Sequence, residues 1–177
     1  MNRRQRESLR RRYQPPCVKL LFVGESPPTS GRFFYRCNSG LYRAMRDVFL
    51  TVEPSITHET FLKAFQEAGC YLVDLCLEPV DQLEPNLRRI ACHAGERSLT
   101  RTIKKLQPQV IATLVRTTEA NSKIAAAHAG WSGPFLHLPY PGRWSHHRKR
   151  FGAILAPHLL PLLQRRYYRN NIQLKPG

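Results

Sequence analysis

Four short apolar runs, each followed or preceded by a stretch with helical spacing, restrict this chain most strongly to one class of fold. The runs cover residues 18–23, 70–77, 109–115 and 134–138, and each has the length of one buried strand. Strands that alternate with helices pair in parallel, because each crossover helix returns the chain to the same end of the sheet. We therefore predict an α/β fold, a three-layer α/β/α sandwich around a central, mainly parallel four-stranded sheet.

The spacing of apolar residues also predicts the helices and loops that connect these strands. We expect helices at residues 2–12, 40–50, 57–68, 95–106, 117–129 and 145–166. Thr57 is the expected cap of the third helix, and Pro157 and Pro161 are expected to break or kink the last one. Residues 24–39 and 79–85 are expected to be loops, the first of them longer than a simple connection needs.

Basic side chains gather at the two ends of the chain, and acidic side chains gather in its middle. The chain holds 28 Lys and Arg against 12 Asp and Glu, a net charge of +16. Residues 1–24 contain seven basic side chains and residues 120–177 contain nine, whereas nine acids lie between Asp47 and Glu96. We expect the two ends to build a positive face, with nucleic acid as its partner rather than a membrane, a ribosome or solvent alone.

Length and composition exclude several other classes of protein. A chain of 177 residues accommodates one domain, and it has no apolar run of about 18 residues that could span a membrane. Its N-terminus lacks the apolar stretch of a secretory signal. Five cysteines without a CxxC pair indicate a reducing compartment. We expect a cytoplasmic monomer, with a basic arm at residues 1–15, a domain at 16–166 and a tail at 167–177.

Two proline-containing loops follow strands at the edge where an open α/β sheet binds its ligands. Residues 24–28 follow the first strand, and residues 138–144 follow the fourth. Both loops lie in the basic parts of the chain. We expect them to form opposite walls of a cleft.

These loops resemble the uracil-DNA glycosylase superfamily, nearest to its branch with a Gly-Glu-Ala-Pro-Gly first motif. Residues 24–27 read Gly-Glu-Ser-Pro, and residues 30–34 resemble the family's Thr-Gly-Arg-x-Phe. Residues 73–75 end a strand where the family places a base-reading Asn, and residues 138–141 take the place of its His-Pro-Ser-Pro loop. The resemblance, over about residues 17–165, implies a DNA glycosylase of base excision repair. Such an enzyme flips a damaged or deaminated base from single- or double-stranded DNA and hydrolyses its N-glycosidic bond.

The resemblance implies roles for individual residues. Glu25, with Ser26, is expected to activate water or to stabilise an oxocarbenium-like transition state; Phe34 is expected to stack on the flipped base, and Asp74 to read its edge. The other expected substrate contacts are Gly24, Pro27, Leu138 and Tyr140, and the expected nucleic-acid contacts are Arg32, Pro141, Gly142, Arg143, His146, Arg148 and Lys149. Each role has a structural alternative: loop amides bound by Glu25, core packing of Phe34, and a strand-end carboxylate at Asp74.

Three positions depart from the family pattern. Leu138 stands where a His or Asn stabilises the leaving group, and the adjacent His137 is expected to point to the opposite face of its strand. Asp74 replaces Asn, and an ionised carboxylate only accepts hydrogen bonds, so it suits a base that offers an N–H. Ser26 stands where other branches have a water-activating Asp or Asn. The departures at Asp74 and Leu138 favour a base other than uracil, or a weak activity. Those at Ser26 and Leu138 also support a catalytically silent member.

Two of the five cysteines bear on whether the protein holds a cofactor. Cys76 and Cys92 match only the later cysteine pair of the branch's iron–sulfur site, so neither a metal nor another cofactor is expected. One alternative function is a catalytically silent member that binds nucleic acid. Another is a hydrolase of free nucleosides or nucleotides, which would not use the terminal arginines.

Overall fold

The sheet at the centre of the molecule is parallel throughout. A computed structural model describes the backbone of residues 1–142 and 144–172, with side chains to residue 164 except that of residue 143. The strands are β1 (Leu20–Gly24), β2 (Cys70–Asp74), β3 (Val110–Thr113) and β4 (Phe135–His137). Their order is β2-β1-β3-β4, and all three neighbouring pairs are parallel. The predicted α/β class and the four strands are confirmed.

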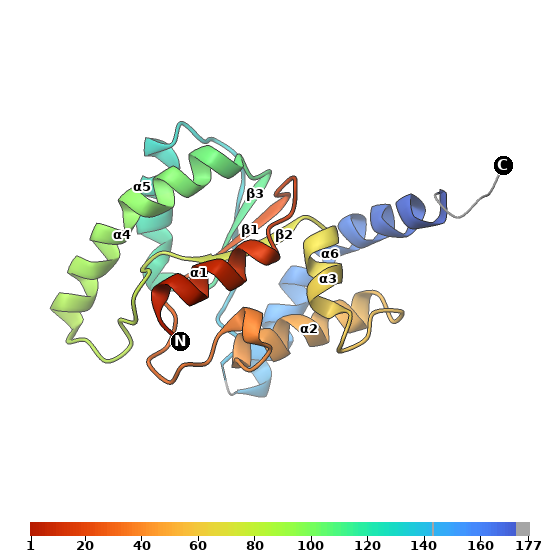
Figure 1. The fold of residues 1–177 in the computed structure, drawn as a ribbon, viewed down its shortest axis with the longest axis horizontal. Coiled ribbons are helices and arrows are strands. Elements are labelled where there is room, and N and C mark those ends of the chain that lie inside the picture. The colour runs from red at the N-terminus through yellow and green to blue at the C-terminus, as the bar shows by residue number, and fades with distance from the viewer. Residues whose placement is uncertain (143, 173–177) are drawn as a thin grey trace.

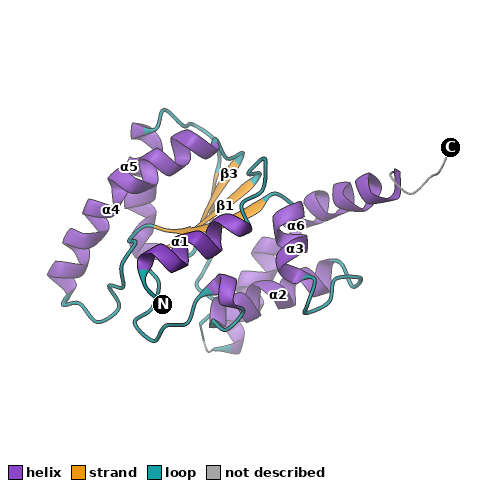
Figure 2. Ribbon diagram, viewed as in Figure 1, coloured by secondary structure: helices purple, strands orange, loops and turns teal. Residues whose placement is uncertain are grey.

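Helices cover both faces of this sheet, so the predicted three layers are present (Figures 1 and 2). On one side lie α2 (Gly40–Val52), α3 (Phe61–Glu67) and α6 (Ser145–Ile172), and on the other α4 (Pro85–Leu106) and α5 (Glu119–His128). An N-terminal helix, α1 (Arg3–Arg12), and two 3₁₀ helices, η1 (Phe34–Arg36) and η2 (Arg116–Thr118), complete the order of elements. The crossover through α4 carries the chain past β1 from one edge strand toward the other.

The core lies on both faces of the sheet, and the side chains of α2, α3 and α6 form the part that covers one face. Phe22 of β1 stacks on Phe65 of α3, with ring centroids 5.7 Å apart. The inward face of α6 carries a buried side chain at every fourth residue: Phe151, Leu155, Leu159 and Leu163. This regular stripe continues past Pro157 and Pro161, which both lie inside one helix, so the helix is not broken there. The other expectation for these prolines, a kink, stays a prediction. Burial of one helical face against the core compensates for the backbone hydrogen bonds that proline removes.

Three helix boundaries differ from the predicted ones by four residues or more: the start of α4, the start of α3 and the end of α6, which lies at Ile172 instead of 166. α4 begins at Pro85 instead of 95, because proline is well suited to the first turn of a helix. Gly95, the predicted start, lies inside α4, where a Cβ would collide with the backbone of Leu75. α3 begins at Phe61 instead of 57, because the Thr57 hydroxyl accepts from the Thr60 N–H in a turn before the helix.

The lengths and hydropathies of the helices also show whether any of them could span a membrane. Among residues 1–142 and 144–172, no helix is both long and apolar enough to cross a membrane.

Candidate functional site

A cavity of about 670 Å³ opens at the carboxyl ends of the strands. Gly24 at the end of β1 and residues 25–28 after it line the cavity. Residues 114–115 after β3, and Tyr140 and Gly142 from the loop after β4, complete this part of the lining. In the sheet, β1 has β2 as one neighbour and β3 as the other. The chain leaves β1 through α2 and α3 and returns as β2. Loops that diverge from adjacent parallel strands leave a crevice between them, and open α/β sheets bind ligands there.

Aromatic and aliphatic side chains form part of the cavity wall. Phe33, Phe34 and Leu72 line it, although both phenylalanines are only 3% exposed. The Phe34 ring makes edge contacts with Tyr35 and Tyr42, at centroid distances of 5.1 and 5.8 Å. Phe34 is therefore held rigidly, and both packing and contact with a flipped base are compatible with its position. Its role in stacking stays a prediction.

Glu25 is held by an arginine that the residue pattern did not single out. Arg88 Nε donates to Glu25 Oε1 at 2.8 Å, and Arg88 Nη2 pairs with the other carboxylate oxygen. The Glu25 side chain is 10% exposed and that of Arg88 is 39% exposed. Hydrogen bonding to Glu25 raises the pKa of the Arg88 guanidinium. Arg88 lies in the first turn of α4. Proline is common at the first position of a helix, so Pro85 is the sequence signal that could have predicted a helix containing Arg88.

Asp74 ends β2 opposite Gly24, the residue that precedes Glu25, because β1 and β2 end in register. Asp74 Oδ2 accepts from Arg10 Nη2 of α1 at 2.5 Å, and the two side chains are 9% and 4% exposed. An ideal Cβ on Gly24 would lie only 2.8 Å from Asp74 Oδ1, so glycine permits this approach. Burial raises the pKa of the Asp74 carboxyl, and the Arg10 guanidinium opposes that shift.

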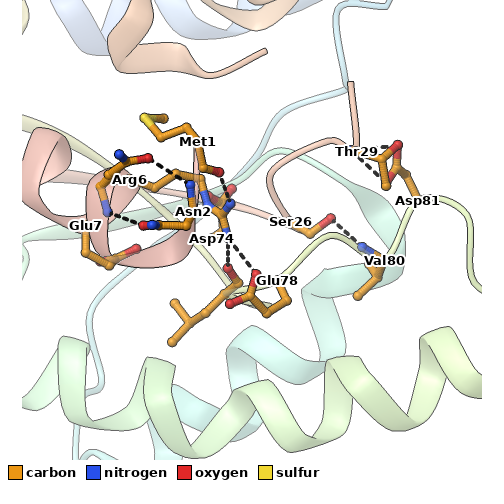
Figure 3. A network of polar contacts seen from close by, with 12 residues as sticks. Met1, Asn2, Arg6, Glu7, Ser26, Thr29, Asp74, Glu78, Val80 and Asp81 are labelled. Atoms are coloured by element: carbon orange, nitrogen blue, oxygen red, sulfur yellow. Dashed lines mark hydrogen bonds and ion pairs between the residues drawn. The ribbon is translucent and has the colours of Figure 1, made fainter. Parts of the chain in front are cut away.

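The first loop is tied to residues 77–81, which precede α4 (Figure 3). The Ser26 hydroxyl accepts from the Val80 N–H at 3.2 Å. The Asp81 carboxylate accepts from the Thr29 N–H at 3.1 Å and from the Thr29 hydroxyl at 3.0 Å. Ser26 and Pro27 both line the cavity, and the Ser26 hydroxyl has a structural partner. Its catalytic role stays a prediction.

Residues of the second loop and of α6 divide between the cavity and the surface around it. Tyr140 lines the cavity and is 49% exposed. Arg148 also lines it, and its Nε donates to the Gly142 carbonyl at 3.3 Å. Arg32 and Arg43 from the first loop and α2 add two more guanidinium groups to the lining. The further predicted contacts divide as follows: His146 and Lys149 are exposed, Pro141 is buried, and Arg143 lies outside the described residues.

Leu138 is an expected substrate contact whose side chain lies in the core. Its side chain is 0% exposed, and it is not among the described residues that line the cavity. Its backbone N–H donates to the Thr113 carbonyl at 2.9 Å, which continues the pairing of β3 with β4. The adjacent His137 points elsewhere, with Nδ1 3.3 Å from Glu119 Oε2. A core side chain at position 138 offers a substrate no accessible surface.

Cys76 and Cys92 lie together behind Glu25. Their sulfur atoms are 3.6 Å apart, and Cys92 Sγ is 4.0 Å from Glu25 Oε1. Two thiols supply half of the ligands of a four-thiolate cluster, and the described residues contain no group of three or more His, Cys, Asp or Glu side chains arranged to hold a metal ion. The pair therefore does not fit an iron–sulfur cluster.

Comparison with known proteins assigns this arrangement to a family. The model of a family described as the uracil DNA glycosylase superfamily matches residues 11–174. A search of curated proteins found no match.

Proposed function

The chain belongs to the uracil DNA glycosylase superfamily, and on this premise we propose that it hydrolyses the N-glycosidic bond of a damaged or deaminated base flipped out of DNA. The observation that supports this most strongly is the position of Glu25 and Asp74. Glu25 follows β1 and Asp74 ends the neighbouring strand β2, and both residues line the same cavity. The cavity volume of about 670 Å³ falls within the range of about 300–1,000 Å³ typical of small-molecule sites. We place this reaction in base excision repair, carried out by a monomer in a reducing compartment.

In this proposal the chain's own residues divide the work of binding the base. The flipped nucleotide enters beside Tyr140, which is exposed at the cavity. Its base lies against the apolar wall that contains Phe34. Stacking of a base on an aromatic ring contributes about 1–3 kcal/mol, and unstacking from the duplex costs a few kcal/mol. The balance favours bases that are already weakly paired, so a mismatched or damaged base is the preferred substrate.

Glu25 provides the charge that the reaction requires. Hydrolysis of a glycosidic bond develops positive charge on the sugar ring, and a carboxylate stabilises that charge or activates the attacking water. Arg88 binds both Glu25 oxygens and so fixes their orientation. We assign Arg88 as a positioning residue, because its contact with the chemistry runs through Glu25.

Asp74 selects the base in this proposal. Oδ2 is engaged by Arg10, and Oδ1 lies close to Gly24, another residue of the cavity lining. An ionised Asp74 accepts hydrogen bonds but donates none, so it favours a base edge that presents an N–H over the edge of uracil, where two carbonyl oxygens flank the imide N–H and repel the carboxylate. The preferred substrate is therefore a deaminated or damaged base with an N–H donor toward β2, and uracil is a weaker one.

A catalytically silent DNA-binding member of the family is the second candidate. Two observations favour it: both Glu25 oxygens are already engaged by Arg88, and Leu138 is buried where the family has a polar residue. The two candidates agree on DNA binding and differ only in base release.

Single-turnover base release separates these candidates. The substrates are labelled oligonucleotides with uracil, hypoxanthine or xanthine, single- and double-stranded, and free nucleosides serve as a further arm. We expect release from at least one modified oligonucleotide and a loss of about 100-fold or more in the Glu25→Gln variant, the scale of one general acid–base or charge-stabilising group. Glu59→Gln is the matched control, because Glu59 is an exposed carboxylate of the turn before α3.

Each outcome of this experiment has a definite meaning. Equal release by wild type and Glu25→Gln would remove Glu25 from the mechanism. The absence of release from every substrate, with DNA binding intact, would favour the silent member. Release from free nucleosides alone would assign the chain to nucleoside hydrolysis.

A further inference from the structure

Helix α1 has two arginine-bearing faces with different surroundings. Arg6 and Arg10, one turn apart, are 7% and 3% exposed. Four further arginines of the same helix are exposed to solvent: Arg3, Arg4, Arg11 and Arg12. Only the last two lie within the residues that match the family model.

The inner face anchors α1 firmly to the body of the protein. Arg6 Nη2 donates to the Leu77 carbonyl at 2.8 Å and to Glu78 Oε2 at 2.7 Å (Figure 3). Arg10 pairs with Asp74 at the end of β2. At the start of the helix, Asn2 and Gln5 form a reciprocal capping box. α1 is therefore a fixed element, and its outer arginines are held in place on a rigid backbone.

The anchor also places α1 next to the cavity rim. Residues 77–81 contact α1 through Leu77 and Glu78 and contact the first loop through Val80 and Asp81 (Figure 3). This segment of five residues thus joins the start of α1 to the loop that carries Glu25. The rim itself carries Arg32, Arg43 and Arg148. A positive surface at the cavity therefore has a neighbouring positive helix.

The outer face of α1 has the charge and the shape to hold phosphates. A surface hollow lies on this face of the helix. It is lined by Glu7, Ser8 and the four exposed arginines Arg3, Arg4, Arg11 and Arg12. Glu7, the only acid of the helix, is paired with Arg10. A helix of ten residues is about 15 Å long, and duplex DNA presents one phosphate charge for about every 1.7 Å of its axis. Arginine forms bidentate hydrogen bonds with phosphate and carries its charge at all ordinary pH values.

We propose that the outer face of α1, formed by Arg3, Arg4, Arg11 and Arg12, binds the phosphate backbone of DNA beside the base-binding cavity. This inference rests on the proposed function only in taking DNA as the partner. The contact is independent of sequence, because it reaches phosphates and no base edges. It holds the nucleic acid while the base enters the cavity.

Salt-dependent binding of a labelled DNA duplex tests this proposal. In the test variant all four outer arginines become glutamine, which keeps a high helix propensity, while Arg6 and Arg10 remain. We expect the affinity at low salt to fall at least about tenfold. The slope of log K against log salt should become shallower by about 0.9 for each phosphate that the variant no longer neutralises.

The control carries the same change of charge on a different helix, α4. Arg97, Arg101, Lys104 and Lys105 are exposed on α4, which runs from the carboxyl end of β2 to the amino end of β3. Their replacement by glutamine should leave most of the affinity and slope unchanged. Circular dichroism and thermal unfolding establish that both variants fold.

Three outcomes would overturn the proposal: wild-type affinity and slope in the α1 variant, equal losses in both variants, or tighter binding of wild type to duplex RNA than to duplex DNA of the same sequence. Base release is a separate measurement, so absence of base release by a wild type that binds DNA through α1 would count against the proposed function alone.

Discussion

The Arg10–Asp74 pair is a buried ion pair in a site that faces a cavity. Two charges in such a position are costly to desolvate, and their mutual attraction offsets the cost only while both partners are present. Arg10 also lies over the Phe33 ring, with Cζ 5.4 Å from the centroid. One side chain of α1 therefore contacts both the buried Asp74 carboxylate and an aromatic residue of the cavity wall.

Removal of Arg10 should destabilise the protein and make its stability depend on pH. In Arg10→Met, Asp74 is left buried without its cation, and we expect a loss of about 3–5 kcal/mol in the free energy of unfolding at neutral pH. Without Arg10 the pKa of Asp74 rises further above its ordinary value of 3.8. The folded state then binds a proton more readily than the unfolded state, so the deficit should shrink as the pH falls toward 3.8.

Urea unfolding at several pH values measures this effect. Arg11→Met, on the exposed face of the same helix, is the control and should change stability by no more than about 0.5 kcal/mol. A deficit that stays constant with pH would mean that Arg10 acts by packing alone.

Strand β2 shows at the level of elements how an edge of the sheet is protected. It is an edge strand, so half of its backbone groups have no neighbouring strand. The Tyr35 hydroxyl accepts from the Leu72 N–H at 2.8 Å and donates to the Leu72 carbonyl at 3.1 Å. Tyr35 of the 3₁₀ helix η1 thus gives the Leu72 N–H and carbonyl the hydrogen-bond partners that a further strand would otherwise provide.

Tyr35→Phe should therefore weaken the β2 edge. It removes one oxygen and leaves two buried backbone groups without partners, at a cost of about 1–3 kcal/mol for each. Hydrogen exchange of the Leu72 amide and urea unfolding measure the change. Tyr140→Phe removes the same hydroxyl from a half-exposed ring and should leave both quantities near their wild-type values. Unchanged exchange at Leu72 in Tyr35→Phe would contradict this role.

The sequence predicts elements better than it predicts the contacts between their side chains. Apolar runs and the spacing of Gly and Pro locate all four strands, and parallel pairing then brings Gly24 and Asp74 to the same edge. The partners of the site were not predictable in this way. Arg10 reaches Asp74 across 64 positions of the chain, and Arg88 reaches Glu25 across 63. Such contacts depend on the angles at which helices dock, which residue spacing does not encode.

At the scale of the whole molecule, the basic ends and the acidic middle of the chain are partly interleaved in space. Arg6 and Arg10 of the basic N-terminus pair with Glu78 and Asp74 of the acidic middle, and Arg88 of that middle pairs with Glu25. The two buried arginines of α1 therefore take no part in the positive face that the charge distribution predicts. A single face built by both termini stays a prediction. Ion pairing fixes the helix, and the remaining charge is free to attract a polyanion.

Burial raises the pKa of several weak acids, and these shifts make the stability of the whole molecule depend on pH in alkaline solution. Burial raises the pKa of the Cys70 thiol above its ordinary value of 9.0 and raises the pKa of Tyr71 from 10.0 to about 12. Burial also raises the pKa of Tyr35 well above 10.0. Each group keeps its proton in the folded state at pH values where the unfolded chain has lost it.

The free energy of unfolding should therefore fall as the pH rises from 9.0 toward 12. Across this window the unfolded state binds fewer protons than the folded state, and each group contributes a loss of about 1.4 kcal/mol per pH unit within its own interval. Urea unfolding under reducing conditions measures the curve. Cys70→Ala should be less stable throughout, because it leaves a cavity, but its stability should fall less steeply between pH 9.0 and 10.0, because the ordinary pKa of a thiol lies below that of tyrosine. A curve parallel to that of wild type in this interval would exclude Cys70 as a source of the alkaline loss.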